Sequence, residues 1–127
     1  MKALKLIFIL LVVLVVIAAG IYLYPKRTTA VLKLNTGDEF IIMLVSNRTT
    51  GYEWQIDRPI DGNKVEQKSL VYVPDKTGLA GSGGKEEWKF RALKVGRSQI
   101  SFKYVRPREK GVKPAEKKVF DVDIKKP

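Results

Sequence analysis

Apolar and polar residues alternate along several short runs of this chain, and that period of two constrains the fold more than any other feature. The clearest runs are residues 39–45, 86–93, 98–105 and 118–125. In the third run, Ile100, Phe102 and Tyr104 fall on one face. Because successive side chains in a strand point to opposite faces, each run predicts a strand with one buried and one solvent-exposed face. Residues 31–34 and 70–73 are weaker strand candidates.

The same spacing defines the buried faces of the other three runs, which are Phe40, Ile42 and Leu44; Trp88, Phe90 and Ala92; and Phe120, Val122 and Ile124. The carboxylates Glu86, Glu87, Asp121 and Asp123 are expected on exposed strand faces, and at the two aspartates solvation is favoured over metal binding. Turn-forming residues separate the runs, and no amphipathic helical stretch of useful length lies among them. The pattern therefore predicts an all-β, antiparallel β-sandwich.

The composition excludes several classes of function. The chain has no cysteine and no histidine. A disulfide framework, a zinc finger, a thiol nucleophile and a Ser-His-Asp or Cys-His catalytic site are therefore impossible. The 24 Lys and Arg residues outnumber the 13 Asp and Glu residues and give a net charge of +11. This balance predicts a basic surface, and we expect neither a cofactor nor enzymatic activity.

The N-terminal segment, residues 6–24, is uncharged and largely apolar, and two lysines precede it. It predicts a hydrophobic helix with two alternative roles. Small residues at 18–20 resemble the cleavage site of a signal peptide. The length of the run and its tyrosines at 22 and 24 are typical of an uncleaved membrane anchor, which we favour. Both alternatives divide the chain into a segment 1–26 and a domain 27–127 outside the cytoplasm.

The first informative loop is Asn47-Arg48-Thr49-Thr50-Gly51-Tyr52. Gly51 can adopt the positive φ of a sharp turn, and the β-branched threonines are stiff at χ1. Such a tip would lose little entropy on docking. An ordinary turn anchored by its aromatic neighbours remains an alternative, and Asn47-Arg48-Thr49 is also a possible glycosylation sequon.

The second loop, residues 78–84, is rich in glycine and contains Leu79, Ala80, Gly81, Ser82, Gly83 and Gly84. Its spacing does not match a P-loop or a dinucleotide-binding motif, and a strand rather than a helix follows it. Two alternatives stay open. The loop is either a flexible hairpin connection or a main-chain-rich surface that lies close to a partner.

The third loop begins with Arg106, Pro107 and Arg108 and continues as a basic stretch. The two arginines could form charge-assisted hydrogen bonds to carboxylates. A solvated loop stiffened by proline is the alternative.

In this order and spacing, the three loops resemble those of the chagasin-type inhibitors of cysteine peptidases. The motifs are Asn-x-Thr-Thr-Gly-Tyr-x-Trp, then Gly-x-Gly-Gly with Trp-x-Phe after it, then Tyr-x-Arg-Pro, and they extend from about Leu34 to Ile124. The resemblance implies an immunoglobulin-like β-sandwich whose three loops form a wedge. The wedge enters the active-site cleft of papain-family peptidases and inhibits them reversibly and competitively. Thr49, Thr50 and Gly51 would cover the catalytic cysteine of the peptidase.

The peptidase-binding residues implied by the resemblance are Asn47, Arg48, Thr49, Thr50, Gly51, Tyr52, Leu79, Ala80, Gly81, Ser82, Gly83, Gly84, Arg106, Pro107 and Arg108. Two of these positions depart from the family pattern. Arg48 stands where the family usually has proline, which predicts a looser central loop because a fixed φ is lost. Arg108 stands where the family usually has an aromatic residue, which predicts the loss of one flanking contact.

Two other functions compete with inhibition. The chain could be a membrane-displayed, immunoglobulin-like adhesive module without inhibitory activity. Its basic face could also bind nucleic acid, but export and the dispersal of the basic residues along the strands argue against that. We expect a papain-family cysteine peptidase as the partner, no nucleic acid, no metal and a monomeric state.

Overall fold

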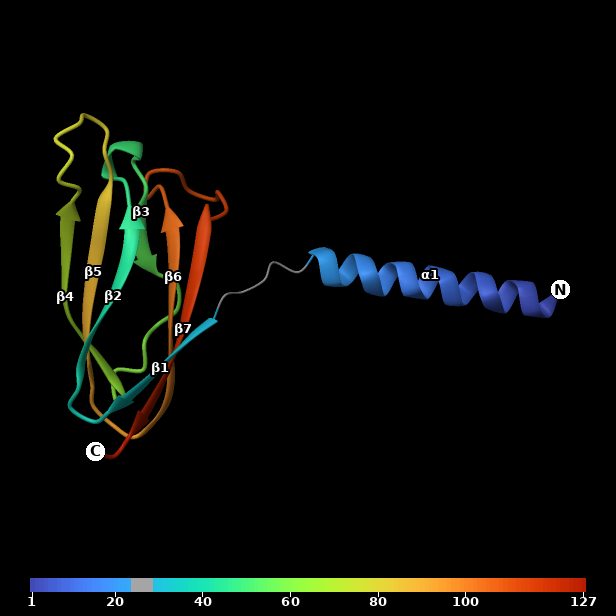
Figure 1. Cartoon of the computed structure of the whole chain (residues 1–127), viewed down its shortest axis with the longest axis horizontal. Coiled ribbons are helices and arrows are strands. Elements are labelled where there is room, and N and C mark those ends of the chain that lie inside the picture. Colours follow the sequence, from blue (N-terminus) through green and yellow to red (C-terminus); the bar gives the residue numbers. More distant parts are fainter. Residues whose placement is uncertain (24–28) are drawn as a thin grey trace.

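The computed structural model describes residues 1–23 and 29–127, and it describes side chains for 1–17 and 29–127. An N-terminal helix, α1 (Lys2–Leu23), precedes a β-sandwich (Figure 1), as the sequence predicted. The side chains of the helix are exposed as far as Ile17. Among the described residues, no helix is long and apolar enough to cross a membrane.

The features that would separate an anchor from a cleaved signal peptide fall largely outside this description. The side chains at positions 18–20 and at Tyr22 are not described, and neither are Tyr24 and the predicted boundary after residue 26.

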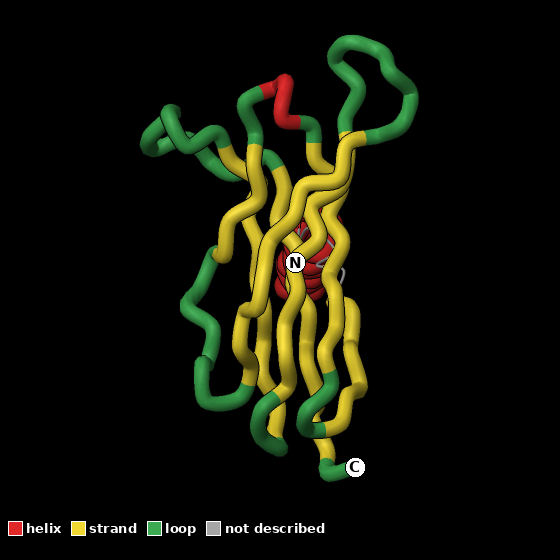
Figure 2. Tube along the Cα trace, turned by 90° about the vertical axis from the view of Figure 1, so that its left-hand side faces the viewer, coloured by secondary structure: helices red, strands yellow, loops and turns green. Residues whose placement is uncertain are grey.

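Within residues 29–127, seven strands form two facing sheets (Figures 1 and 2). The four-stranded sheet has the order β1 (Thr29–Asn35), β7 (Glu116–Lys125), β6 (Gly96–Val105), β3 (Glu53–Ile56). The three-stranded sheet has the order β2 (Glu39–Ser46), β5 (Gly84–Ala92), β4 (Val65–Pro74). The β-sandwich predicted from the alternation is therefore confirmed.

One strand pair departs from the antiparallel prediction. β1 runs parallel to β7, with Thr29 opposite Val119 and Asn35 opposite Lys125, whereas the other described pairs are antiparallel. After β1 the chain crosses to the three-stranded sheet and forms β2 there. β1 therefore pairs with the last strand of its own sheet, β7, rather than with the strand that follows it in sequence. Hydrophobic alternation sets which face of a strand is buried but does not set its direction.

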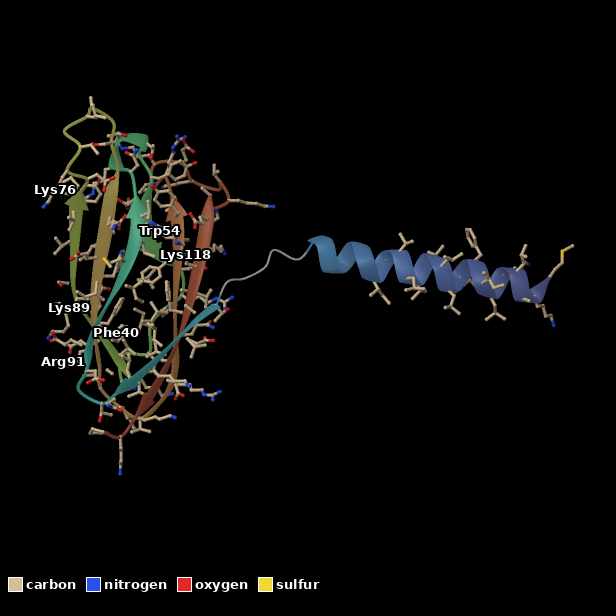
Figure 3. All side chains as sticks on the ribbon, in the orientation of Figure 1. Phe40, Trp54, Lys76, Lys89, Arg91 and Lys118 are labelled. Atoms are coloured by element: carbon tan, nitrogen blue, oxygen red, sulfur yellow. The ribbon has the colours of Figure 1, made fainter. Side chains whose placement is uncertain are left out.

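The core lies between the sheets and contains the side chains that the alternation selected. Ile42, Leu44, Trp88, Phe90, Ala92, Ile100, Phe102, Val122 and Ile124 are all buried. Phe102 lies at the centre of an aromatic cluster, with ring centroids 5.1 Å from Trp88 and 5.9 Å from Phe120, both edge to face. Figure 3 shows Phe40 and Trp54 directed between the sheets and Lys89 and Arg91 directed outward. Such burial stabilises the fold by about 2–3 kcal/mol per large side chain.

The expectation that Glu86 is exposed is wrong. Glu86 is only 3% exposed, and it shares the buried face of β5 with Trp88 and Phe90. Its Oε2 accepts a hydrogen bond from the main-chain N–H of Trp54 at 3.3 Å. The physical reason is that β3 is a short edge strand, and this carboxylate from the opposite sheet satisfies a donor that would otherwise be buried without a partner. Glu87 is half-buried.

Candidate functional site: the three-loop end of the sandwich

Three loops gather at one end of the sandwich, because β2, β4 and β6 all run toward that end (Figures 1 and 2). Loop 1 (residues 47–52) joins β2 to β3, loop 2 (residues 75–83) joins β4 to β5, and loop 3 (residues 106–115) joins β6 to β7. Each of the three sequence motifs therefore lies at the same end of the molecule, although they are far apart along the chain.

Loop 1 folds into a short 3₁₀ turn that its own side chains hold. Asn47 caps the turn, and its Oδ1 accepts hydrogen bonds from the Thr49 N–H at 3.1 Å and the Thr49 hydroxyl at 2.6 Å. The Thr50 hydroxyl donates to the Asn47 carbonyl at 2.6 Å. Gly51 closes the turn with a φ of 80°, so the sharp turn predicted from this glycine is confirmed. Local hydrogen bonds of this kind fix the loop without help from a partner.

A stack of three aromatic rings connects loop 1 to the core. The Tyr52 ring stacks on Tyr104 at a centroid distance of 5.1 Å, and Tyr104 stacks on Trp54 at 4.8 Å. The Tyr104 hydroxyl accepts a hydrogen bond from the Asn47 N–H at 3.0 Å. The indole Nε1 of Trp54 donates to the Val45 carbonyl at 2.9 Å. Both ends of loop 1 are therefore tied to the half-buried side chain of Tyr104.

Loop 2 lies against the base of loop 1. The Asn47 side-chain amide donates to the Gly81 carbonyl at 3.1 Å. A Cβ on Gly83 would come within 3.0 Å of the Ser46 carbonyl oxygen, so the two main chains approach closely there. The Ser82 N–H and hydroxyl both bond the Leu79 carbonyl, which folds the tip into a turn. Leu79 itself is 71% exposed.

Loop 3 contacts the other side of loop 1 through Arg106. The Arg106 Nε donates to the Thr50 carbonyl at 3.2 Å, and its guanidinium lies 4.4 Å from the centroid of the Tyr52 ring. The same guanidinium pairs with Glu109 at 3.2 Å. This ion pair lies within loop 3, so it leaves the predicted recognition of a partner's carboxylates a prediction. Arg108 is exposed, and among the described residues it forms no ion pair.

Arg48 lies against the neighbouring strand β4. Its guanidinium lies 4.1 Å from the centroid of the Tyr72 ring on β4. The sequence motifs missed Tyr72 and Glu86 as residues that shape this end, although they include Tyr104 in Tyr-x-Arg-Pro. For Glu86 the missed signal is its place in the alternation with Trp88, whereas Tyr72 lies in a strand, outside the loop motifs.

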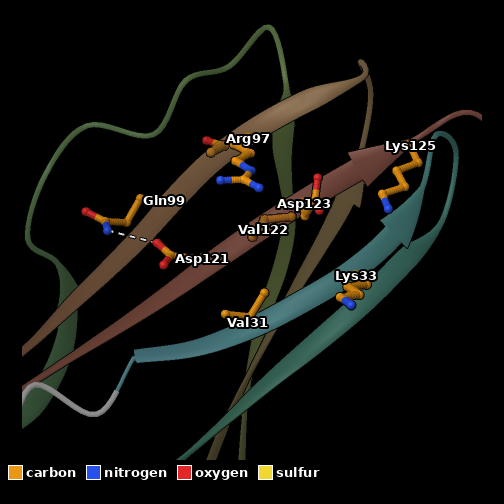
Figure 4. Close-up of a pocket in the computed structure, with 9 residues that line it drawn as sticks. Val31, Lys33, Arg97, Gln99, Asp121, Val122, Asp123 and Lys125 are labelled. Carbon is orange, nitrogen blue, oxygen red and sulfur yellow. Dashed lines mark hydrogen bonds between the residues drawn. The ribbon is translucent and has the colours of Figure 1, made fainter.

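The tips of the loops project as a ridge rather than enclosing a cavity. Thr49, Thr50, Gly51 and Leu79 are exposed. Open hollows of about 410 Å³ and 480 Å³ flank loop 1, one toward loop 3 and one toward β4. A hollow of about 780 Å³ lies away from the loops, on the outer face of the four-stranded sheet near Asp121 and Lys33 (Figure 4). Its open surface of mixed charge is part of an ordinary solvated sheet face.

The groups gathered at the loops are main-chain groups and mostly basic side chains. Within the described part of the chain, no group of three histidine, cysteine, aspartate or glutamate residues could hold a metal ion. The charged residues of loops 1 to 3 are mostly basic. The acidic residues are Asp75 and Glu109, and the basic residues are Arg48, Lys76, Arg106, Arg108, Lys110 and Lys113. A projecting, rigid and basic surface is suited to recognising another molecule.

Comparison with known proteins assigns the fold and the loops to a family. The profile described as chagasin family peptidase inhibitor I42 matches residues 33–124. The chain belongs to the chagasin family. The resemblance predicted from the three loop motifs is thus confirmed, and proteins of this inhibitor family are generally not enzymes.

Three individual proteins are similar to this chain. Amoebiasin-2 of Entamoeba histolytica is 33% identical over 103 residues, which are 81% of this chain and 84% of that protein. The crystal structure of the cysteine protease inhibitor EhICP2 from Entamoeba histolytica has a TM-score of 0.61 at 26% identity and covers 80% of this chain and 100% of that one. The structure of PbICP-C, solved in complex with falcipain-2, shares the fold with a TM-score of 0.61 at 20% identity. The match covers 79% of this chain and 90% of that one.

Proposed function

We propose that this chagasin-family protein is a reversible, competitive inhibitor of papain-family cysteine peptidases, and that its three loops enter the active-site cleft. The observation that carries the proposal is the interlocked ridge of loops, in which loop 1 is bonded to loop 2 through Asn47 and to loop 3 through Arg106. A ridge held in one conformation before binding loses little entropy when it docks.

In this proposal loop 1 occupies the centre of the cleft. Thr49, Thr50 and Gly51 are small and exposed, and they cover the catalytic cysteine of the peptidase. Loop 2, through its residues 79–84, and loop 3, through Arg106, Pro107 and Arg108, hold the two walls. Inhibition then needs no reaction by the inhibitor, since occupying the cleft is enough to exclude substrate. The basic character of the loops would favour association with an acidic cleft.

The descriptions of two similar proteins support a cysteine peptidase as the partner. EhICP2 is described as a cysteine protease inhibitor, and PbICP-C was solved in complex with falcipain-2. We further propose that the domain works outside the cytoplasm as a monomer, with residues 6–24 acting as a membrane anchor or as a cleaved signal peptide. The apolar composition of that segment and the lysines before it support this placement.

The test is steady-state inhibition of papain by the full chain in mild detergent, beside two matched double variants. Thr50→Phe with Gly51→Phe makes the tip of loop 1 bulky. Thr36→Phe with Gly37→Phe makes the same change in the β1–β2 turn at the opposite end of the sandwich. Gly37 and Gly51 are a close match, because both have a positive φ and nothing within 4 Å of an added Cβ.

We expect the wild type and the Thr36/Gly37 variant to inhibit, and the Thr50/Gly51 variant to lose inhibition. Excess substrate should restore the rate if inhibition is competitive, and dilution should restore it if binding is reversible. No inhibition of papain or of a panel of related peptidases by the wild type would reject the proposal. The displayed adhesive module would then be the better interpretation.

A further inference from the structure

We propose that Arg48 is a positioning residue that fixes loop 1 by stacking on Tyr72, and that this contact replaces the constraint a proline would supply at the same position. The inference rests on the proposed inhibitory function, because loop 1 is the part of the ridge assigned to the catalytic cysteine. It gives Arg48 a role within the inhibitor rather than in contact with the peptidase.

The main chain around Arg48 already has the conformation that suits proline. Arg48 is the first residue of the 3₁₀ turn, and its cap Asn47 is extended, with a φ of −130° and a ψ of 99°. Proline is favoured at the first position of a helical turn and requires an extended residue before it. In the described structure the Arg48 N–H donates no hydrogen bond, so proline would remove no donor that is in use.

Arg48 lacks the fixed φ of proline, and a contact made by its side chain supplies the restraint instead. The guanidinium lies 4.1 Å from the Tyr72 ring centroid. Within the described part of the molecule, no carboxylate lies within ion-pair distance of Arg48. The ring is therefore the partner that orders this side chain, while the exposed charge stays in contact with water.

The Tyr72 ring is held in place by packing against the neighbouring strand. It lies in β4 opposite Glu86 of β5, and it is half-buried. Its Cζ and Oη lie 2.8 Å from the point where a Cβ of Gly84 would stand, so the ring rests directly on the main chain of β5. Loop 1 is thereby attached to the three-stranded sheet on this side. Arg106 and the tyrosine stack attach it to the four-stranded sheet on the other.

The experiment is a double-mutant cycle on the full chain in mild detergent with Arg48→Ala, Tyr72→Leu and their combination. Arg48→Pro, alone and combined with Tyr72→Leu, provides the rescue. Tyr72→Phe is the matched control, because it keeps the ring and removes only a hydroxyl. Two readouts are needed, which are the inhibition constant for papain and the NMR shifts of the free protein at the Thr49, Thr50 and Gly51 amides and the Arg48 side chain.

We expect Arg48→Ala and Tyr72→Leu each to raise the inhibition constant about threefold to tenfold, from the strength of an exposed cation–π contact and the loss of loop order. Their combination should be no worse than either alone, since both remove one interaction. Arg48→Pro should bind within about twofold of the wild type and should make Tyr72→Leu harmless. The Arg48 side-chain protons should be shifted upfield by the ring in the wild type and in Tyr72→Phe but not in Tyr72→Leu.

Two results would overturn the inference. If Arg48→Pro keeps the amide shifts of the wild-type loop but binds as weakly as Arg48→Ala, the guanidinium contacts the peptidase instead. If the Arg48 side-chain shifts are unchanged in Tyr72→Leu, the stacking contact does not exist in solution. Failure of the proposed function is distinguishable from both, because the wild type would then inhibit no peptidase while the shifts of the free protein still report on the contact.

Discussion

Gly84 should tolerate no side chain, even the methyl group of alanine. It is buried in the central strand β5, between Ser46 of β2 and Pro74 of β4. A Cβ at this position would lie 2.4 Å from the Val73 carbonyl oxygen and 2.8 Å from the Tyr72 ring. The oxygen belongs to the main chain of the neighbouring strand, so relief of the clash must separate β4 from β5.

We therefore place the cost of Gly84→Ala near the upper end of the usual range for overpacking, about 3 kcal/mol. For a domain of this size each kcal/mol lowers the midpoint of thermal unfolding by about 4–8 °C, so the expected drop is about 12–24 °C. The same change should displace Tyr72 and thereby raise the inhibition constant. Near-UV circular dichroism during a thermal ramp measures the first effect, and the papain assay measures the second.

The matched control is Gly62→Ala, at an exposed turn where nothing lies within 4 Å of an added Cβ and φ is not positive. This variant should differ from the wild type by no more than about 0.5 kcal/mol. If the midpoints of thermal unfolding of Gly84→Ala and Gly62→Ala differ by less than about 2 °C, the reasoning is refuted. The added methyl group would then fit between strands β4 and β5 without separating them.

Three further predictions concern the core and the charge of the protein. Glu86→Ala should lower the free energy of unfolding by about 1–3 kcal/mol in urea titration, because the Trp54 N–H loses its acceptor, whereas Glu86→Gln keeps an acceptor oxygen and should cost less. Phe102→Ala should cost about 3–5 kcal/mol in the same titration, and the exposed Met43→Ala less than about 0.5 kcal/mol; similar values for the two would contradict the assigned core. The association rate with a peptidase whose cleft is acidic should fall steeply as salt rises from about 0.05 to 0.5 M in stopped-flow measurements, and a flat profile would exclude electrostatic steering.

Local pattern predicted the strands well where one face is buried and the other is wet. The runs that became β2, β5, β6 and β7 show this alternation, and their predicted inner faces are confirmed, with Phe40, Tyr104 and Phe120 partly rather than fully buried. β4 extends over Val65–Pro74, well beyond the predicted 70–73. It is an edge strand with few buried side chains and an irregular register between Gln67 and Ser69, so its alternation is weak.

The alternation of apolar and polar residues does not predict contacts between distant parts of the chain. The parallel pairing of β1 with β7, the stacking of Arg48 on Tyr72 and the bond from Arg106 to Thr50 all depend on the way the sheets are connected. Glu86 is a different kind of failure. Its place in the alternation predicts burial, whereas the general preference of carboxylates for solvent predicts exposure.

The pairing of β1 with β7 also has a consequence for how this protein is made. Within the described chain, the first strand has the last strand as its sole neighbour in the sheet. β1 leaves the ribosome long before β7 exists, and the fully buried Val122 and Ile124 arrive only with β7. Contacts so far apart in sequence form slowly and close large loops. The domain therefore folds only once synthesis has reached its last strand, and a chain that stops short of β7 yields an aggregation-prone fragment with an unpaired strand rather than a weaker inhibitor.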